Sequence, residues 1–237
     1  SSSAASDVYK RQIASKVLMK VLYAARMCRY DLLRAVCGLA RLVTKWSVDC
    51  DRRLHHLMCY VNSSLDHKLI GWVGDTPDSV LPHLFADADF AGDTTVQKST
   101  NGMHLCMRGR HTNFPINGAC KLQGSTALST PEAEMVSAMF AVKHFGLPHL
   151  TLWETLLHVQ DDVYIIFHED NEAMIRICQT GRNPTMRYLD RVHRCCVQWL
   201  SERFNLDKFK IFYEKSDLAA ADIYTKSFTD KTKWQIK

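Results

Sequence analysis

The segment Val163–His168 constrains the fold of this chain more than any other part of the sequence. It is a short apolar run that lies between two helical patterns, one reaching about Phe145 and one beginning at Asn171. A strand that is apolar along its whole length is buried on both faces, as in sheets covered by helices. The run therefore predicts an inner strand of an α/β sheet.

The rest of the C-terminal two thirds supplies the other elements of such a sheet. The expected strands are 83–90, 101–107, 111–116, 163–168 and 208–214, with a hairpin turn at 108–110. The expected helices are 131–145, 171–181, 189–204 and 216–225. This order predicts the fold class α/β, with a mixed sheet flanked by helices.

The N-terminal part has a different pattern. Residues 13–63 contain three runs with helical spacing, and 74–82 resembles a linker because it combines prolines, a glycine and polar residues. The small, polar residues at the start are interpreted as a non-native leader. The expected organisation is a leader at 1–12, a helical segment at 13–78, an α/β domain at 79–230 and a tail at 231–237.

Charge is distributed unevenly along the chain. Residues 1–80 hold twelve Lys and Arg against seven Asp and Glu, whereas residues 81–237 hold eighteen of each. The net charge of +5 therefore comes from the N-terminal third. Such an excess suits a nucleic-acid partner, and a solvated basic helical surface explains it equally well.

The nine cysteines and the hydropathy pattern bear on the cellular setting. Because no two cysteines are spaced Cys-x-x-Cys, reduced thiols in an intracellular protein are favoured over disulfides or a zinc site. No apolar run approaches the ~20 residues that cross a bilayer. No secretion signal is visible either, so no membrane partner is expected.

Metal-ion hydrolysis of a phosphodiester needs several carboxylates that converge from different elements. Asp87 lies between apolar neighbours in the first expected strand, where an unpaired carboxylate is costly. Asp89 points to the same face, and for Asp89 and Asp93 a role in capping the next turn is favoured. A calcium loop that begins at Asp87 lacks its later ligands.

Glu132 and Glu134 lie about 200° apart around the first expected helix of this region, so both cannot face one site. Glu134 shares its face with Ser137, Ala138 and Ala141, whose small side chains allow close approach to the sheet. This favours Glu134 as the buried acid. Either glutamate could instead stabilise the helix dipole in the first turn.

Two later acids complete the set of candidates. Asp170 follows the apolar strand at its carboxyl end, where ligands bind in open α/β sheets, and it could equally cap the next helix. Asp222 follows three alanines and could lie close to the sheet or face solvent. No nucleophile-elbow or phosphate-loop pattern occurs, which argues against Ser–His catalysis and a nucleoside-triphosphate site.

Four blocks of sequence carry a resemblance to a known family. They are Phe85–Asp93 with Lys98–Gly102, Lys121–Gln123 with Ala127–Glu134, Asp170–Ala173, and Ala221–Lys226. Together, over residues 83–228, they resemble the ribonuclease H domain of copia-type retrotransposon Pol polyproteins. Further upstream, Val21–Arg26, Asp31–Leu33 and Leu39–Arg41 resemble the helical end of the family's reverse transcriptase.

The resemblance implies a five-stranded sheet in the order 3-2-1-4-5 and a catalytic, metal-binding quartet: Asp87, Glu134, Asp170 and Asp222. Asp87 would bridge two Mg²⁺ ions, for which Mn²⁺ could substitute; Glu134 and Asp170 would hold one and Asp222 the other. The implied reaction is hydrolysis of the RNA strand of RNA–DNA hybrids during reverse transcription. The implied partners are the hybrid and the rest of the polyprotein, in a cytoplasmic particle or the nucleus.

Several polar residues are candidate nucleic-acid contacts, although simple surface charge explains each basic one singly. They are Lys98, Arg108, Arg110, Lys121 and Asn171.

The sequence also departs from the family pattern. Pro131, Met135 and Tyr224 stand where Thr, Tyr and Leu are usual, and the segment just before Asp222 contains no histidine. A run of Lys-His-Ile-Asp is replaced by Met186–Asp190. None of these changes removes an implied metal ligand. The alternatives are a catalytically decayed remnant that binds nucleic acid without cutting it, and a different nuclease or transposase on the same fold.

Overall fold

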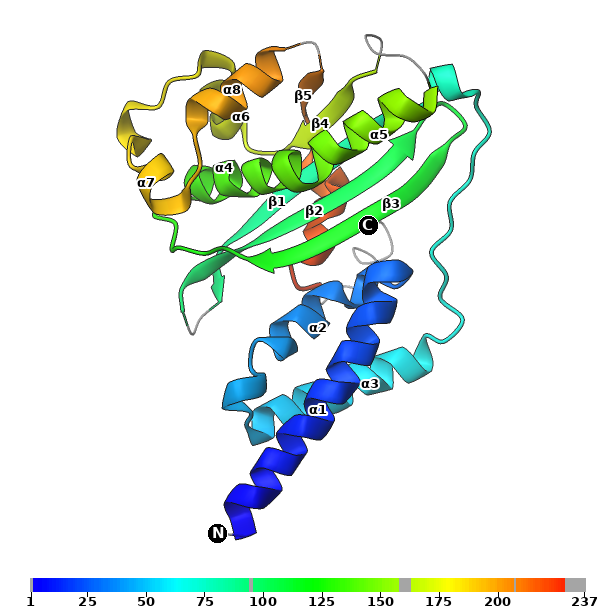
Figure 1. The fold of residues 1–237 in the computed structure, drawn as a ribbon, viewed down its shortest axis with the longest axis vertical. Helices are drawn as coiled ribbons and strands as arrows, with labels where there is room; N and C mark the ends of the chain where they lie inside the picture. Colours follow the sequence, from blue (N-terminus) through cyan, green and yellow to red (C-terminus); the bar gives the residue numbers. More distant parts are fainter. Residues whose placement is uncertain (1, 94–95, 158–162, 207, 229–237) are drawn as a thin grey trace. The chain divides into compact units, whose positions relative to one another are not determined.

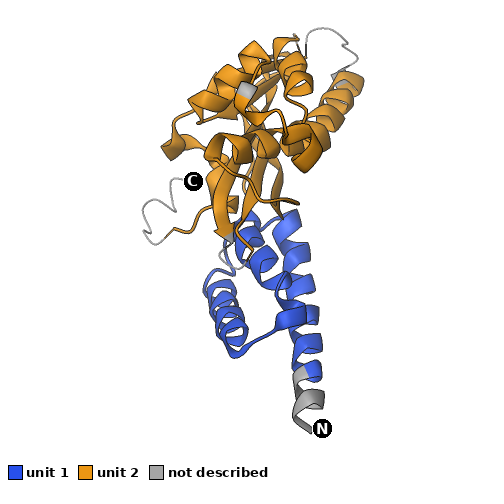
Figure 2. Cartoon of the chain, turned by 90° about the vertical axis from the view of Figure 1, so that its left-hand side faces the viewer, with its two compact units in different colours: residues 1–69 blue, residues 70–237 orange. Residues whose placement is uncertain are grey.

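The computed structural model describes residues 2–93, 96–157, 163–206 and 208–228. The chain divides into two compact units, residues 1–69 and residues 70–237, which Figure 2 shows in different colours. Among the described residues no helix combines the length and apolar character that a membrane span requires. The tail expected at 231–237 lies outside the described residues.

The first unit is built from helices α1 (Ser2–Met27), α2 (Leu33–Ala40) and α3 (Val48–Ser63). Their apolar faces bury Leu18, Val36 and Leu39, and Ser47 caps α3 by accepting a hydrogen bond from the backbone of Cys50. Helix α1 begins at Ser2, so residues 2–12 of the segment interpreted as a non-native leader lie within this helix. Ala, Lys, Arg and Gln in this segment are good helix formers and extend the helix that follows.

A polar cluster links the segment before α2 to the C-terminal end of α3. Arg29 donates to Asp31 at 2.8 Å and to the Ser64 hydroxyl at 2.7 Å, and Tyr60 donates to the same Asp31 carboxylate at 3.0 Å. Because Asp31 precedes α2 and Tyr60 lies on α3, the cluster fixes these two helices against each other. The carboxylate of Asp31 is thereby neutralised by Arg29.

The second unit contains a five-stranded sheet in the order β3-β2-β1-β4-β5 (Figure 1). The strands are β1 (Leu81–Asp93), β2 (Lys98–Arg108), β3 (Asn113–Leu122), β4 (Ile165–Glu169) and β5 (Phe209–Tyr213). β1, β2 and β3 pair antiparallel, whereas β4 is parallel to both β1 and β5. The α/β class, the mixed sheet and the strand order expected from the sequence are therefore confirmed.

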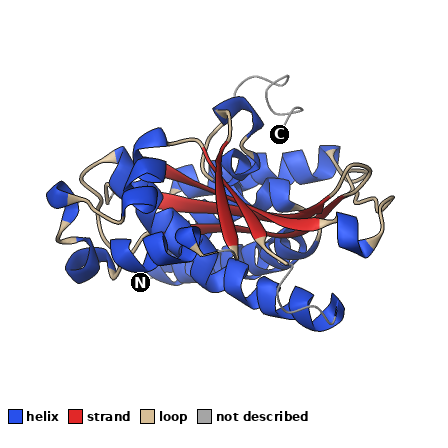
Figure 3. Cartoon of the chain, turned by 90° about the horizontal axis from the view of Figure 1, so that it is seen from above, coloured by secondary structure: helices blue, strands red, loops and turns tan. Residues whose placement is uncertain are grey.

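Helices cover one face of this sheet. They are α4 (Thr130–Ala141), α5 (Leu147–Leu157), α6 (Glu172–Thr180), α7 (Leu189–His193) and α8 (Val197–Asn205). Figure 1 and Figure 3 show them packed along the strands. The core between the two layers includes Leu84, Met103, Met135, Phe167 and Leu200.

Three helical segments differ from the sequence-based expectation. A π-helical turn, Val142–Gly146, carries α4 on into α5, which the periodicity did not indicate. The helix expected at 189–204 is divided because Arg194 has a left-handed backbone (φ 54°). The helix expected at 216–225 is replaced by two 3-10 turns, Ser216–Leu218 and η7 (Ala220–Tyr224).

The turn η7 packs on the face of the sheet opposite the helices. Side chains alternate along a strand, so Leu84 and Ala86 face the helical core while Phe85 and Asp87 face the other side. On that side Tyr224 is fully buried, and its hydroxyl lies 2.8 Å from His104 Nδ1. The closing sequence block is therefore anchored on the strand face that carries Asp87.

Candidate active site

Three acids from three different elements meet where β4 ends beside the middle of β1. Asp87 lies in β1, Asp170 directly follows β4, and Glu134 lies in the second turn of α4. A carboxylate oxygen from each lies within 4.8 Å of the other two. Asp87 and Glu134 are only 2% and 3% exposed, whereas Asp170 is partly exposed, so the group is buried on one side and open to solvent at Asp170. The parallel pairing of β1 and β4 is what places Asp87 beside Asp170.

The helix α4 is held against β1 by a small side chain. Ser137 donates a hydrogen bond of 2.7 Å to the backbone carbonyl of Asp87. Ser137, Ala138 and Ala141 are each buried without exposed area, so the helix backbone lies close to the sheet. This contact positions Glu134, one helical turn before Ser137, at the Asp87 carboxylate.

Glu132 is equally buried but is used elsewhere. Its carboxylate accepts hydrogen bonds from the Tyr188 hydroxyl at 2.8 Å and from Leu128 N at 3.0 Å, and it lies 2.7 Å from His193 Nε2. It therefore ties α7 to the start of α4. Glu132 and Glu134 leave the helix in different directions, as helical geometry requires.

The fourth predicted acid, Asp222, is connected to the cluster by ion pairs with a shared lysine, Lys226. Asp222 in η7 is 3% exposed, and its Oδ1 lies 2.6 Å from Lys226 Nζ. The same ammonium lies 3.3 Å from Asp87 Oδ1, while Thr225 donates a hydrogen bond to Asp87 Oδ2. Asp222 is thus linked to Asp87 by a shared cation and is not one of the three acids whose oxygens lie together.

The carboxyl of Asp89 lies outside this group. It lies against Gly92, where β1 leaves its regular register with β2. This position fits the turn role favoured for it from the sequence.

A further buried acid, Glu169, was missed by the sequence analysis. It ends β4, is 1% exposed, and its Oε1 accepts a hydrogen bond from Asn171 N at 3.1 Å. Its Oε2 has no hydrogen-bond partner among the described residues, and neither has Oε2 of Glu134. A signal was present: Ile165, Phe167 and Glu169 alternate along one face of the strand, which places this acid on the buried side.

The cluster carries more negative charge than its surroundings neutralise. Burial raises the pKa of Glu134 well above its usual value, and repulsion from Glu169, Asp87 and Asp170 raises it further. Burial also raises the pKa of Asp87, to about 6, against the opposing effects of Lys226 and the Thr225 hydrogen bond. Such a cluster favours a bound cation, because hard oxygen ligands and excess negative charge are what Mg²⁺ selects.

These pKa directions predict how Glu169→Gln changes stability in the presence of a chelator. Burial raises the pKa of Glu169 well above 4.5, so its charged form opposes folding once the pH exceeds about 4.5. The penalty grows as the pH rises towards the folded-state pKa. Removing the charge is expected to raise the free energy of unfolding by roughly 1–3 kcal/mol at pH 8 and by less at pH 5.

Urea unfolding at the two pH values, in EDTA, tests this expectation. Glu172→Gln is the matched control, because Glu172 is a solvent-exposed glutamate on α6. It is expected to change stability little at either pH. A loss of stability in Glu169→Gln at pH 8 would mean that the charged carboxylate is held by favourable partners, contrary to this reading.

The candidate nucleic-acid contacts are not gathered in one place. Arg108 and Arg110 lie at the end of β2 that pairs with Leu81, six residues or about 20 Å along the strand from Gly102, the partner of Asp87. Arg108 packs over the Phe85 ring at 4.7 Å.

The remaining candidates lie on β2, on β3 and at the start of α6. Lys98 donates to the carbonyl of Gly124, and Lys121 lies beside Asn101 in the register and over the Phe140 ring at 5.3 Å. Asn171 adjoins Asp170 and caps α6 by accepting from Met174 N.

Strand order, the parallel pairing of β1 with β4 and the acids that meet where β4 ends describe an α/β domain with a carboxylate cluster on its central strands. No family model matches the chain. The sequence is similar to the retrovirus-related Pol polyprotein from transposon TNT 1-94 of Nicotiana tabacum, with 24% identity over 213 residues. This similarity confirms the resemblance to retrotransposon Pol polyproteins. It covers 90% of this chain, and the chain spans 15% of the polyprotein.

Among solved structures, LC11-RNase H1, isolated from compost by a metagenomic approach, aligns with 11% identity and a TM-score of 0.42. The alignment covers 62% of this chain and 93% of that one.

Proposed function

We propose that this chain is the ribonuclease H region of a copia-type retrotransposon and hydrolyses the RNA strand of RNA–DNA hybrids. The observation that carries the proposal is the convergence of Asp87, Glu134 and Asp170, with the buried Oε2 of Glu134 finding no hydrogen-bond partner in the described part of the chain. A buried oxygen of this kind is costly unless a cation or a donor meets it. The donor set consists only of carboxylates, which fits Mg²⁺ or Mn²⁺.

Asp87, Glu134, Asp170 and Asp222 are the residues proposed to hold the metal ions. Asp87 would bridge, Glu134 and Asp170 would complete one site, and Asp222 would supply the other. When bound, two such ions activate water and stabilise the leaving oxygen of a phosphodiester, which would yield 5′-phosphate and 3′-hydroxyl ends. Thr225 orients Asp87 through Oδ2, and Ser137 fixes the backbone of the same residue.

Selection of a hybrid would depend on its shape. A-form duplexes are recognised through phosphate and 2′-hydroxyl contacts rather than base edges. Asn171 adjoins Asp170 and is the candidate contact beside the acid cluster, and Lys98 and Lys121 are kept as proposed phosphate contacts. Asn171, next to Asp170, keeps its amide NH₂ for a 2′-hydroxyl because its Oδ1 is used to cap α6.

The decisive experiment is a cleavage assay with the full chain and hybrids labelled on either strand, in Mg²⁺, Mn²⁺ or EDTA. Metal-dependent cutting of the RNA strand alone supports the proposal. Cutting of duplex DNA would favour a different nuclease or transposase. If the folded protein bound the hybrid but did not cut it in either metal, the chain would be a catalytically decayed remnant that binds nucleic acid.

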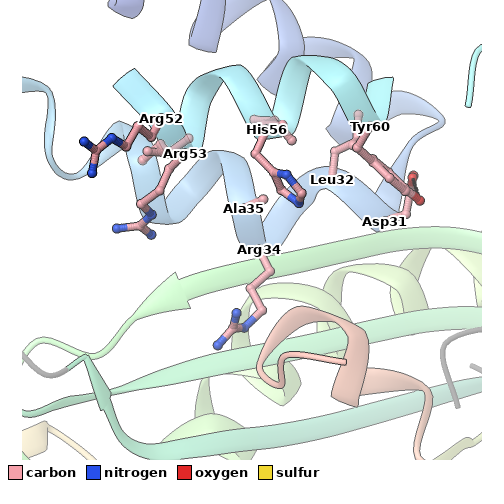
Figure 4. A pocket seen from close by; sticks show the side chains of 10 residues that line it. Asp31, Leu32, Arg34, Ala35, Arg52, Arg53, His56 and Tyr60 are labelled. Carbon is pink, nitrogen blue, oxygen red and sulfur yellow. Dashed lines mark hydrogen bonds between the residues drawn. The ribbon is translucent and has the colours of Figure 1, made fainter. Parts of the chain in front are cut away.

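The first unit is proposed to be the C-terminal helical part of the reverse transcriptase, with the rest of the polyprotein as its partner. It contains a pocket of about 430 Å³ between α2 and α3 (Figure 4). The floor is apolar, with Leu32, Leu39 and Leu57. Arg52 and Arg53 project from one end of α3, and the lining residues are Asp31, Leu32, Arg34, Ala35, Leu39, Arg52, Arg53, His56, Leu57 and Tyr60.

Part of the excess of basic residues in the N-terminal third lines this pocket. Three arginines line it, and its single carboxylate, Asp31, is paired with Arg29. Its net positive charge suits the phosphates of a nucleic-acid backbone.

Replacing Arg52 and Arg53 together by alanine is expected to weaken hybrid binding and to reduce the slope of log affinity against log salt by about 2. Cleavage at saturating hybrid is expected to stay unchanged, because neither residue belongs to the acid cluster. Lys68→Ala, at an exposed position outside the pocket, is the control. Fluorescence anisotropy over a salt series measures the slope; equal slopes for both variants would contradict the assignment.

A further inference from the structure

Lys226 places a cation on two of the proposed metal ligands. Its Nζ lies 2.6 Å from Asp222 Oδ1 and 3.3 Å from Asp87 Oδ1. Both carboxylates are almost fully buried, with side chains 5% and 3% exposed. The lysine side chain is 38% exposed, so it lies at the edge of the cluster and enters it only with its ammonium group.

The position of the ammonium is selective within the cluster. It contacts the acids proposed to share the second ion, Asp87 and Asp222, and makes no ion pair with Glu134 or Asp170 among the described residues. The other oxygen of Asp87 is taken by the Thr225 hydroxyl, one residue before Lys226. The ammonium and a divalent ion would therefore require the same Oδ1 atoms.

The way the lysine is attached allows it to leave. Lys226 lies two residues after the end of η7, and η7 is fixed on the sheet by the fully buried Tyr224. Four rotatable carbons separate the fixed backbone from the ammonium, and the partly exposed stem can turn to solvent without disturbing η7. The ammonium is strongly hydrated, so its cost of leaving is mainly the loss of the two carboxylate contacts.

We propose that Lys226 is a tethered competitor of the second divalent ion: it occupies Asp87 and Asp222 until metal displaces it, and so sets the metal concentration at which the two-ion centre forms. This inference rests on the metal site of the proposed function. The first site, formed by Glu134 and Asp170 with Asp87, is affected less because the lysine contacts only one of its ligands. After displacement the ammonium remains beside the cluster, within reach of a substrate phosphate.

The test is Mn²⁺ binding to the full chain by isothermal titration calorimetry, comparing wild type with Lys226→Met. Methionine removes the charge from a side chain of similar length. The weaker of two binding events is expected to tighten about tenfold in the variant, while the stronger one changes little. Lys226→Arg keeps the charge and is expected to bind as wild type does. Lys215→Met, at an exposed lysine away from both acids, controls for net charge.

A second measurement is the melting temperature in EDTA and in Mn²⁺. Loss of the internal cation is expected to lower the melting temperature of Lys226→Met in EDTA and to enlarge its gain on adding metal. If that variant does not fold, Lys226→Gln gives the same comparison and keeps a donor for Asp222.

The outcomes separate the two proposals. Two binding events with equal affinities in wild type and Lys226→Met would overturn the competitor role and leave the proposed function standing. If the wild type, like the Asp87→Asn variant, bound no metal, the proposed metal site itself would be overturned.

Discussion

Replacing Asp87 by asparagine is expected to reduce cleavage of an RNA–DNA hybrid by at least ~10³-fold while the protein stays folded. Asp87 is the acid on which the proposed site depends most. Its carboxylate lies within 4.8 Å of Glu134 and Asp170, is contacted by Lys226, and accepts from Thr225. Asparagine has the same shape, so Thr225 and the strand keep their places while one metal-binding charge is lost.

The stability of this variant is expected to change in the opposite direction from its activity. Burial and neighbouring acids raise the pKa of Asp87 to about 6, so its charge at pH 8 opposes folding. Removing it relieves repulsion with Glu134, and the melting temperature in EDTA should not fall. Simultaneous loss of activity and gain or retention of stability is the signature of a binding site rather than of a structural acid.

Asp89→Asn is the matched control for this experiment. Asp89 lies two residues further along the same strand, and its carboxylate lies against Gly92, outside the group of three acids. This variant is expected to keep most of the activity. The measurement is kcat/KM for cleavage in Mg²⁺, with Mn²⁺ binding measured in parallel. Cleavage by Asp87→Asn at the wild-type rate would refute the proposed site.

The central strand was predictable from the sequence because its signal is local. The apolar run Val163–His168 becomes β4, Ile165–Glu169, which lies between β1 and β5. Burial on both faces is recorded in the composition of the strand itself. The order of the five strands is not recorded in this way, since it depends on pairings between segments far apart. It was obtained from the resemblance to a family rather than from periodicity.

The choice between Glu132 and Glu134 shows where local reasoning ends. Helical geometry states that the two cannot face one site, and the small residues Ser137, Ala138 and Ala141 favoured Glu134 without showing where Glu132 goes. The answer depends on Tyr188 and His193, which lie 56 and 61 residues away and hold Glu132 elsewhere. No pattern around the glutamates records those partners.

Glu169 and Arg194 were missed for different reasons. Glu169 directly follows the run Val163–His168, which was interpreted as apolar along its whole length. The two-residue alternation that buries the Glu169 side chain was therefore not recognised. Arg194 breaks a continuous helical pattern by adopting a left-handed backbone, a conformation for which glycine or asparagine is the usual signal.

The second large effect is expected at Tyr224, a position outside the acid cluster. Its ring is fully buried and lies parallel to His104 at 6.0 Å, and its hydroxyl is 2.8 Å from His104 Nδ1. A Cβ atom added at Gly118 would collide with this ring, and one at Gly102 would meet its Cβ at 3.2 Å. The two glycines thus leave the space on the sheet into which the tyrosine packs. Leucine, usual here in the family, could fill part of this space without the hydrogen bond.

Tyr224→Ala is therefore expected to lower the free energy of unfolding by about 3–5 kcal/mol, because it removes a large buried side chain and leaves a cavity. Activity is expected to fall further than the unfolded fraction accounts for, since η7 carries Asp222 and is followed by Thr225 and Lys226. Tyr224→Phe keeps the ring and is expected to cost about 1–2 kcal/mol through the lost hydrogen bond, with activity largely retained. Urea unfolding and cleavage assays on both variants measure the two effects separately. If Tyr224→Ala kept wild-type cleavage per folded molecule, Asp222 and Lys226 would not depend on this anchor, and the buried ring would serve stability alone.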